Sequence, residues 1–258
     1  MTNELMVDAL NDLLEIYKDN KRAQTFNAII YGDIGSGKTK LISTCRRPIL
    51  VHSFDPGGTL TLRKEKDFMK EGGIYVDTRY EEEDAKAPAA YNAWEKEFDK
   101  LRADKVFDTL GTYVIDSATT WADALMNAVL KRNGRAAGVP QQMDWMVQMN
   151  TIRDALKAFC SLPCDCILTA HVDYDKDEGS GRMVAGPLLT GKLKQKIPLL
   201  FDELYRAVAQ RTAKGTEYSL QTQADSMYRA RTRLGTGGTF EPNEAPDITA
   251  LLKKAGLL

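Results

Sequence analysis

The chain has 258 residues, of which 43% are hydrophobic and 28% charged, and its formal net charge is −1. This length fits one α/β domain with a sizeable core, or one domain with small additions. The near-neutral balance excludes a uniformly basic nucleic-acid coat, although it is compatible with a local basic groove. No apolar run approaches the roughly 20 residues of a membrane span, so we expect no membrane partner.

The chain opens with a pattern typical of an amphipathic helix over residues 3–19. Residues 1–22 are therefore predicted to form a leading segment, and its acidic residues are not typical of a secretory signal. The apolar side of this helix could cap the core, which is the simpler role, or dock on a neighbouring subunit. Its apolar positions are Leu5, Met6, Leu10, Leu13, Leu14 and Tyr17.

A glycine-studded turn follows the first apolar run. "FNAIIY" (26–31) predicts a short buried strand, and "KTKLISTC" (38–45) predicts the start of a helix. Between them the pattern Gly-x-x-x-x-Gly-Lys-[Ser/Thr] indicates a loop whose N–H groups cradle phosphates, with a lysine for the β- and γ-phosphates and a hydroxyl for Mg²⁺. A chance glycine turn is the alternative, and the strand–loop–helix context disfavours it. The predicted nucleotide-binding residues are Gly32, Asp33, Ile34, Gly35, Ser36, Gly37, Lys38, Thr39 and Lys40.

Further strands and helices alternate along the chain. This alternation favours an α/β fold, in which a mainly parallel sheet is flanked by helices. The C-terminal third instead predicts antiparallel strands that extend the sheet. Predicted strands are 47–55, 73–79, 111–116, 164–171, 201–210, 216–223 and 226–233, and predicted helices are 56–73, 91–107, 117–134, 143–163 and 245–257.

Three polar residues end predicted strands. Asp116 follows "TYVI" and is the expected second Mg²⁺ ligand, with a helix cap as the alternative. The residue after Asp116 is a serine rather than a catalytic glutamate, so a base for hydrolysis must come from elsewhere. Asp55 is the candidate base, although Asp-Pro-Gly-Gly is also a good turn sequence. His171 ends "ILTAH" and is either a sensor of the γ-phosphate or a half-buried structural histidine.

The four cysteines do not meet the spacing of a zinc site, although "CSLPCDC" (160–166) brings three of them together. The only histidines are His52 and His171. We therefore expect reduced thiols in a cytoplasmic protein.

Taken together, the stretches "YGDIGSGKT", "SFDPGG", "YVIDS", "ILTAH", "GPLLTGKLKQKIPLLFDELYR" and "PDITALLKKAGL" resemble phage-encoded RecA-like P-loop ATPases of the single-strand annealing protein and recombinase family. The resemblance covers nearly the whole chain from about residue 26. It implies a RecA-like ATPase domain over residues 23–258, ATP and Mg²⁺ as cofactors, and the host cell cytoplasm as location.

The resemblance also implies a DNA-facing loop after the sensor strand, here residues 172–198. Arg182, Lys192, Lys194 and Lys196 are the candidate DNA contacts. Asp173, Asp175 and Asp177 oppose this role, and a solvated surface loop is the alternative.

Relatives of this kind place a basic pair on the γ-phosphate of the neighbouring subunit. Arg231 and Arg233 match that pair, and on a strand they would share one face with Arg229. A solvated strand face is the alternative. The trans role predicts a homo-oligomer, either a ring or a filament.

The expected function is a low-turnover, DNA-stimulated ATPase that assembles on single-stranded DNA and promotes annealing or strand exchange in phage recombination. Participation of a phage single-strand-binding protein is left open. The alternatives are a phage replication accessory ATPase of helicase or loader type and, less favoured, a small-molecule P-loop kinase.

Overall fold

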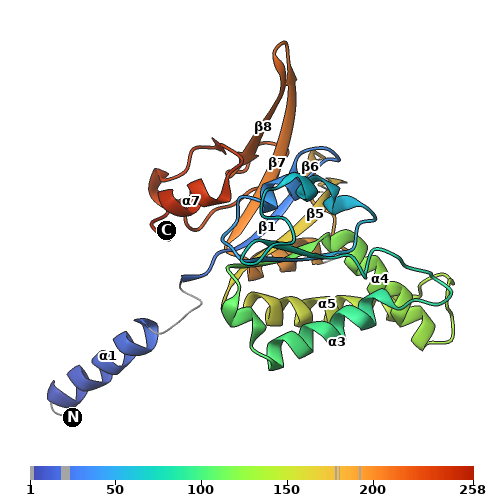
Figure 1. The fold of residues 1–258 in the computed structure, drawn as a ribbon, viewed down its shortest axis with the longest axis horizontal. Helices are drawn as coiled ribbons and strands as arrows, with labels where there is room; N and C mark the ends of the chain where they lie inside the picture. The colour runs from blue at the N-terminus through green and yellow to red at the C-terminus, as the bar shows by residue number, and fades with distance from the viewer. Residues whose placement is uncertain (1–2, 19–23, 178, 180, 192) are drawn as a thin grey trace.

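The computed structural model describes residues 3–18, 24–177, 179, 181–191 and 193–258. Its centre is a nine-stranded sheet in the order β3-β2-β4-β5-β1-β7-β8-β9, with β6 paired to β5 (Figure 1). The six strands from β3 to β7 are parallel, and β8 and β9 add antiparallel pairs. The predicted α/β fold class, a mainly parallel sheet flanked by helices with an antiparallel C-terminal extension, is confirmed. The strands are β1 Asn27–Gly32, β2 Ile49–Ser53, β3 Ile74–Asp77, β4 Thr112–Asp116, β5 Asp165–Lys176, β6 Met183–Pro187, β7 Glu203–Thr212, β8 Gly215–Gln221 and β9 Asn243–Glu244.

Helices cover both faces of this sheet, because the central strands are apolar on both sides. Ile29 and Tyr31 of β1 pack in the same cluster as α3, α4 and α5, which lie together below the sheet in Figure 1. Ala28 and Ile30 face the other way, into a cluster with α2 and α7. The helices are α1 Asn3–Lys18, α2 Lys38–Ile42, α3 Ala90–Ala103, α4 Ala118–Arg132, α5 Gln142–Cys160, α6 Leu193–Lys196 and α7 Ile248–Lys254.

Several predicted elements are wrong in extent or type. The helix that follows the phosphate loop, α2, has only five residues. The predicted helix over 56–73 contains a 3-10 helix, η2 (Gly58–Lys64), and the strand predicted over 226–233 reduces to isolated bridges, such as that between Leu204 and Arg231. Residues 172–198, predicted as a loop, hold the end of β5 and all of β6. The remaining short 3-10 helices are η3 Val106–Thr109, η4 Ile197–Leu200 and η5 Thr236–Gly238.

The leading helix α1 stands away from the sheet in Figure 1. The structure does not bear out core capping, because the large apolar side chains that it describes on this helix are exposed. These are Val7, Leu10, Leu13, Leu14 and Ile16.

All four cysteines are buried and free of disulfides. Within the described part of the chain, no helix is both long enough and apolar enough to cross a membrane.

Candidate functional site

The phosphate loop runs from the end of β1 to the start of α2. Gly32 fits only as glycine, because an added Cβ would lie 2.5 Å from the carbonyl oxygen of Ala207 on β7. Gly35 and Gly37 take φ values of 79° and 88°, which L side chains rarely adopt. The predicted glycines therefore allow the conformation that the pattern requires: Gly32 lets the loop pass close to the backbone of β7, and Gly35 and Gly37 supply its positive φ angles.

Lys38 is the cation of this loop and is 8% exposed. Its Nζ atom donates hydrogen bonds of 2.9 Å to the carbonyl oxygens of Gly32 and Asp33. Burial lowers the pKa of Lys38, while the carboxylates of Asp116, Asp55 and Asp33 act in the opposite direction. A buried ammonium group held by neutral carbonyls fits a loop that receives an anion.

A second buried polar atom supports the same reading. Ser36 is 5% exposed, and its Oγ atom has no hydrogen-bond partner among the described residues. A buried hydroxyl without a partner costs free energy, so this loop gains when a ligand supplies one. A phosphate group, with its acceptor oxygens, has the chemistry that both Ser36 and Lys38 need.

Asp116 lies directly across from the loop at the end of β4. Its Oδ2 atom accepts a 2.9 Å hydrogen bond from the hydroxyl of Thr39, and its Oδ1 atom accepts one from the hydroxyl of Thr169. Burial raises the pKa of this carboxyl, which is 2% exposed. A buried carboxylate in contact with a hydroxyl offers two oxygen ligands, and a divalent cation would compensate the buried negative charge.

Thr169 was not predicted, although it lies two residues before His171 in the same strand. Side chains at i and i+2 of a strand share a face, so the spacing alone could have indicated it. The structure makes Thr169 the residue that orients the carboxyl group of Asp116.

Asp55 and His171 are brought together at the same sheet edge. The Nε2 atom of His171 lies 3.4 Å from Oδ2 of Asp55, and the hydroxyls of Ser117 and Thr120 donate to Oδ1 of Asp55. Burial raises the pKa of Asp55, but the hydrogen bonds from His171, Thr120 and Ser117 outweigh it, so the net pKa is lowered. Asp55 is therefore held as a carboxylate.

The alternative role of Asp55, as a turn former, is also present in the backbone. Its carbonyl oxygen accepts a hydrogen bond from Gly58 N, which closes the Asp-Pro-Gly-Gly turn. The side chain takes no part in this turn and faces the hydroxyls of α4 instead. The two interpretations of Asp55 are thus compatible.

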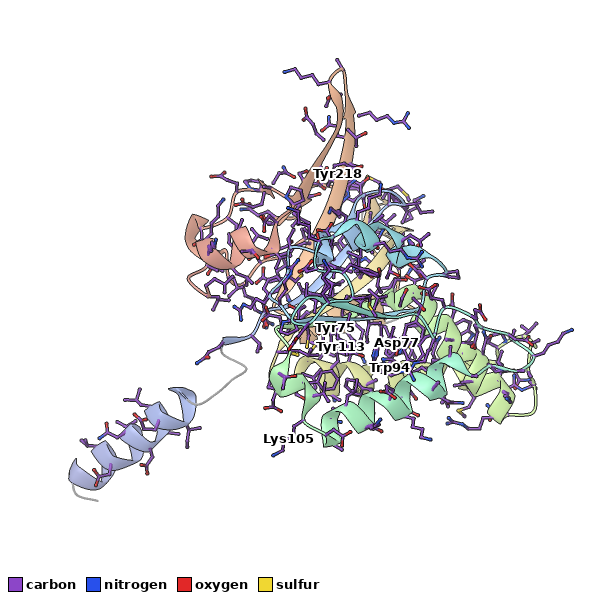
Figure 2. All side chains as sticks on the ribbon, viewed as in Figure 1. Tyr75, Asp77, Trp94, Lys105, Tyr113 and Tyr218 are labelled. Atoms are coloured by element: carbon purple, nitrogen blue, oxygen red, sulfur yellow. The ribbon has the colours of Figure 1, made fainter. Side chains whose placement is uncertain are left out.

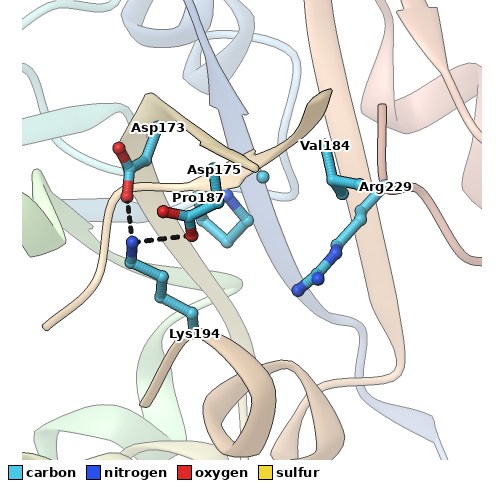
Figure 3. Close-up of a pocket in the computed structure, with 7 residues that line it drawn as sticks. Asp173, Asp175, Val184, Pro187, Lys194 and Arg229 are labelled. Atoms are coloured by element: carbon cyan, nitrogen blue, oxygen red, sulfur yellow. Dashed lines mark hydrogen bonds and ion pairs between the residues drawn. The ribbon is translucent and has the colours of Figure 1, made fainter. Parts of the chain in front are cut away.

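The predicted DNA-facing segment forms a β5–β6 hairpin followed by α6. Lys194 of α6 makes ion pairs with both Asp173 and Asp175 of β5, and the pair with Asp175 measures 2.8 Å (Figure 3). These contacts offset the charge that Lys194 was predicted to offer to DNA. Arg182 and Lys196 are exposed, and Lys192 lies outside the described residues.

Arg231 and Arg233 lie far from the phosphate loop of their own chain. Arg231 pairs with Leu204 near the amino end of β7, whereas the loop follows the carboxyl end of the parallel strand β1. The guanidinium group of Arg231 donates to the carbonyl oxygens of Pro198 and Phe201 at 2.6 and 2.7 Å. Arg233 pairs with Asp202 at 3.1 Å and is 52% exposed. Arg231 thus has a role within its own fold, and Arg233 is the more accessible of the two.

Two solved structures align with most of this chain at low identity. The KaiC-like protein PH0186 from Pyrococcus horikoshii OT3 aligns with 81% of this chain and 82% of its own, at 12% identity and a TM-score of 0.43. The flagellar accessory protein FlaH from Methanocaldococcus jannaschii aligns with 84% of this chain and 83% of its own, at 12% identity and a TM-score of 0.45. No curated protein sequence matches the chain.

The sequence pattern of one family covers most of the chain, from the start of β1 to the segment after β8. It spans the phosphate loop, Asp55, Asp116 and His171 within residues 25–234. The chain belongs to the AAA domain family.

Proposed function

We propose that this P-loop ATPase binds ATP with Mg²⁺ between its phosphate loop and Asp116, hydrolyses it slowly, and uses the cycle to assemble on single-stranded DNA in phage recombination. The observation that carries the proposal is the pair formed by Asp55 and His171, 3.4 Å apart at the edge where Asp116 lies. A carboxylate held in its charged form beside a phosphate site has the chemistry of a general base.

Each residue of the site has a distinct task in this proposal. Lys38 and Ser36 bind the phosphates, and Thr39 and Asp116 would hold Mg²⁺. A bound Mg²⁺ supplies positive charge to the phosphates during transfer. Asp55 accepts a proton from the attacking water, and Ser117 and Thr120 fix the direction of its carboxyl group.

His171 links this chemistry to the rest of the molecule. It is in contact with Asp55 and lies on β5, the strand that continues into the β5–β6 hairpin. Thr119 lies at the start of α4. Its hydroxyl accepts a hydrogen bond from His171 N and donates one to the carbonyl oxygen of Leu188, which follows β6. Loss of the γ-phosphate would therefore change the contacts at both ends of the hairpin.

The DNA-binding part of the proposal is supported by the position of this hairpin and by the exposed side chains of Arg182 and Lys196. A replication accessory ATPase is the second candidate. It is favoured by the ion pairs of Lys194 with Asp173 and Asp175, which leave less free positive charge for DNA.

The deciding experiment measures ATP binding, ATP hydrolysis with and without single-stranded DNA, and the mass of the assembly. Lys38→Ala, which removes the ammonium group from the loop, is the control that separates this site from a contaminating ATPase. Stimulation by DNA accompanied by assembly supports recombination. Hydrolysis that DNA leaves unchanged, with no change of mass, supports the accessory role, and absence of ATP binding overturns both.

A further inference from the structure

A tyrosine from the C-terminal extension lies against the phosphate loop. A Cβ added to Gly37 would lie 3.3 Å from Cδ1 and 3.5 Å from Cε1 of Tyr218 on β8. The tyrosine ring therefore covers the last glycine of the loop, which is also the residue that precedes α2. Figure 2 labels Tyr218 on the projecting β7–β8 hairpin.

The ring lies on the face of the sheet that α2 covers. Leu220, two residues along β8 and so on the same face, is fully buried in one cluster with Leu41 and Ile42 of α2. Tyr218 is one step farther out along the strand and is 48% exposed. Half of a large aromatic surface is thus open to solvent beside the start of α2.

The order of the strands shows which end of a nucleotide would reach Tyr218. Three groups are suited to the γ-phosphate: Asp55 follows β2, Asp116 ends β4 and His171 lies on β5. All three strands lie on one side of β1. The strand β8 lies on the other side, beyond β7. A triphosphate whose tail points toward Asp116 therefore directs its nucleoside away from β4.

We infer that Tyr218 is the platform on which the nucleobase of the bound nucleotide stacks. This inference rests on the proposed function, because it requires the triphosphate to occupy the loop. An aromatic ring presents its face to any base and gains most from the large rings of purines. In this assignment the phosphate loop binds the phosphates and Tyr218 of the β7–β8 hairpin binds the base. The antiparallel extension is then part of the nucleotide site.

The test compares ATP with inorganic tripolyphosphate, which has the phosphates but no base, by calorimetric titration in the presence of Mg²⁺. For Tyr218→Leu, which keeps an apolar contact on Gly37 but removes the ring, we expect affinity for ATP to fall roughly tenfold. Affinity for tripolyphosphate should stay at the parent value. Tyr218→Phe retains the ring, and its affinity for ATP should remain within about twofold of the parent.

A matched control is Tyr75→Leu on β3, at the opposite edge of the sheet, which should alter neither affinity. If Tyr218→Leu binds ATP as tightly as the parent, or loses ATP and tripolyphosphate equally, the stacking role is overturned while ATP binding stands. If the parent binds neither ligand, the proposed function itself fails, and this inference fails with it.

Discussion

The imidazole of His171 and the carboxylate of Asp55 lie 3.4 Å apart, although their positions in the chain differ by 116. The parallel sheet brings them together, because β2 pairs with β4 and β4 pairs with β5. Their contact joins the candidate base to the strand that leads into the β5–β6 hairpin. In the proposed function, proton transfer and the conformational response would therefore involve adjacent side chains.

Asp55→Asn should separate binding from hydrolysis. The amide keeps the shape of the carboxyl group but cannot accept a proton from water, so we expect the hydrolysis rate to fall roughly 100-fold or more. Affinity for ATP should change little, since Lys38 and Ser36 hold the phosphates. Steady-state hydrolysis and equilibrium ATP binding check this. A variant that hydrolyses ATP at the parent rate would show that the base lies elsewhere.

Thr169→Val should lower the affinity for Mg²⁺ without preventing the nucleotide from binding to the phosphate loop. Valine fills the same volume but cannot donate to Oδ1 of Asp116, and loss of such an orienting partner costs roughly 10-fold or more in metal affinity. We expect hydrolysis to require correspondingly more Mg²⁺. Thr112→Val is the matched control, since Thr112 is also buried but its hydroxyl donates to Arg46 O at the amino end of β4. Equal Mg²⁺ requirements in the two variants would contradict the assignment.

The central strands and the phosphate loop could be predicted because their signals are local. "FNAIIY" and "TYVID" are apolar runs that favour buried strands on their own, and the loop pattern is contained in eight residues. The contacts of Asp55 with Ser117 and Thr120 could not be predicted. They depend on the register that sets Ser53 of β2 beside Asp116 of β4, and no local pattern specifies this register.

Two C-terminal predictions were wrong for identifiable reasons. Residues 172–176 alternate apolar and polar side chains, which is the pattern of a strand, whereas the resemblance implied a loop there. The alternating arginines of 229–233 suggested a strand, yet they pair only through isolated bridges, and Arg231 turns inward onto carbonyl oxygens. In the first case the resemblance outweighed the local pattern, and in the second the local pattern was overridden by the carbonyl oxygens that Arg231 satisfies.

Asp165 should make the stability of the chain depend on pH. It is 1% exposed at the start of β5, and burial raises its pKa to about 6, against the opposing charge of Arg46. In the unfolded chain the pKa of an aspartate carboxyl group is about 3.9. Between these values the folded chain binds more protons than the unfolded chain, so the free energy of unfolding falls as pH rises toward 6.

The full effect, reached above pH 6, is about 3 kcal/mol at roughly 1.4 kcal/mol per pKa unit. Asp165→Asn keeps an oxygen for the hydrogen bond from Phe26 N but does not titrate. Urea unfolding of both proteins at pH 4.5 and 7.5 measures the difference. We expect the parent to lose stability relative to the variant at the higher pH, and parallel behaviour would contradict the raised pKa.

Removing the acids that hold Lys194 should strengthen binding to single-stranded DNA. In the double variant Asp173→Asn, Asp175→Asn the lysine loses both ion pairs, and two negative charges leave the β5–β6 hairpin. We expect affinity to rise roughly tenfold at low salt and the gain to shrink as salt increases, because phosphate contacts release counterions. Fluorescence anisotropy of a labelled oligonucleotide across a salt series measures both effects.

Asp154→Asn on α5 is the control for charge alone, since Asp154 is exposed and pairs with Arg153 away from the hairpin. Its affinity for DNA should stay near the parent value. Adding Lys194→Ala to the double variant should remove most of the gain, because the freed ammonium group is then absent. A double variant that binds DNA no better than the parent would show that DNA does not contact this hairpin, and the accessory role would then be the better account of the chain.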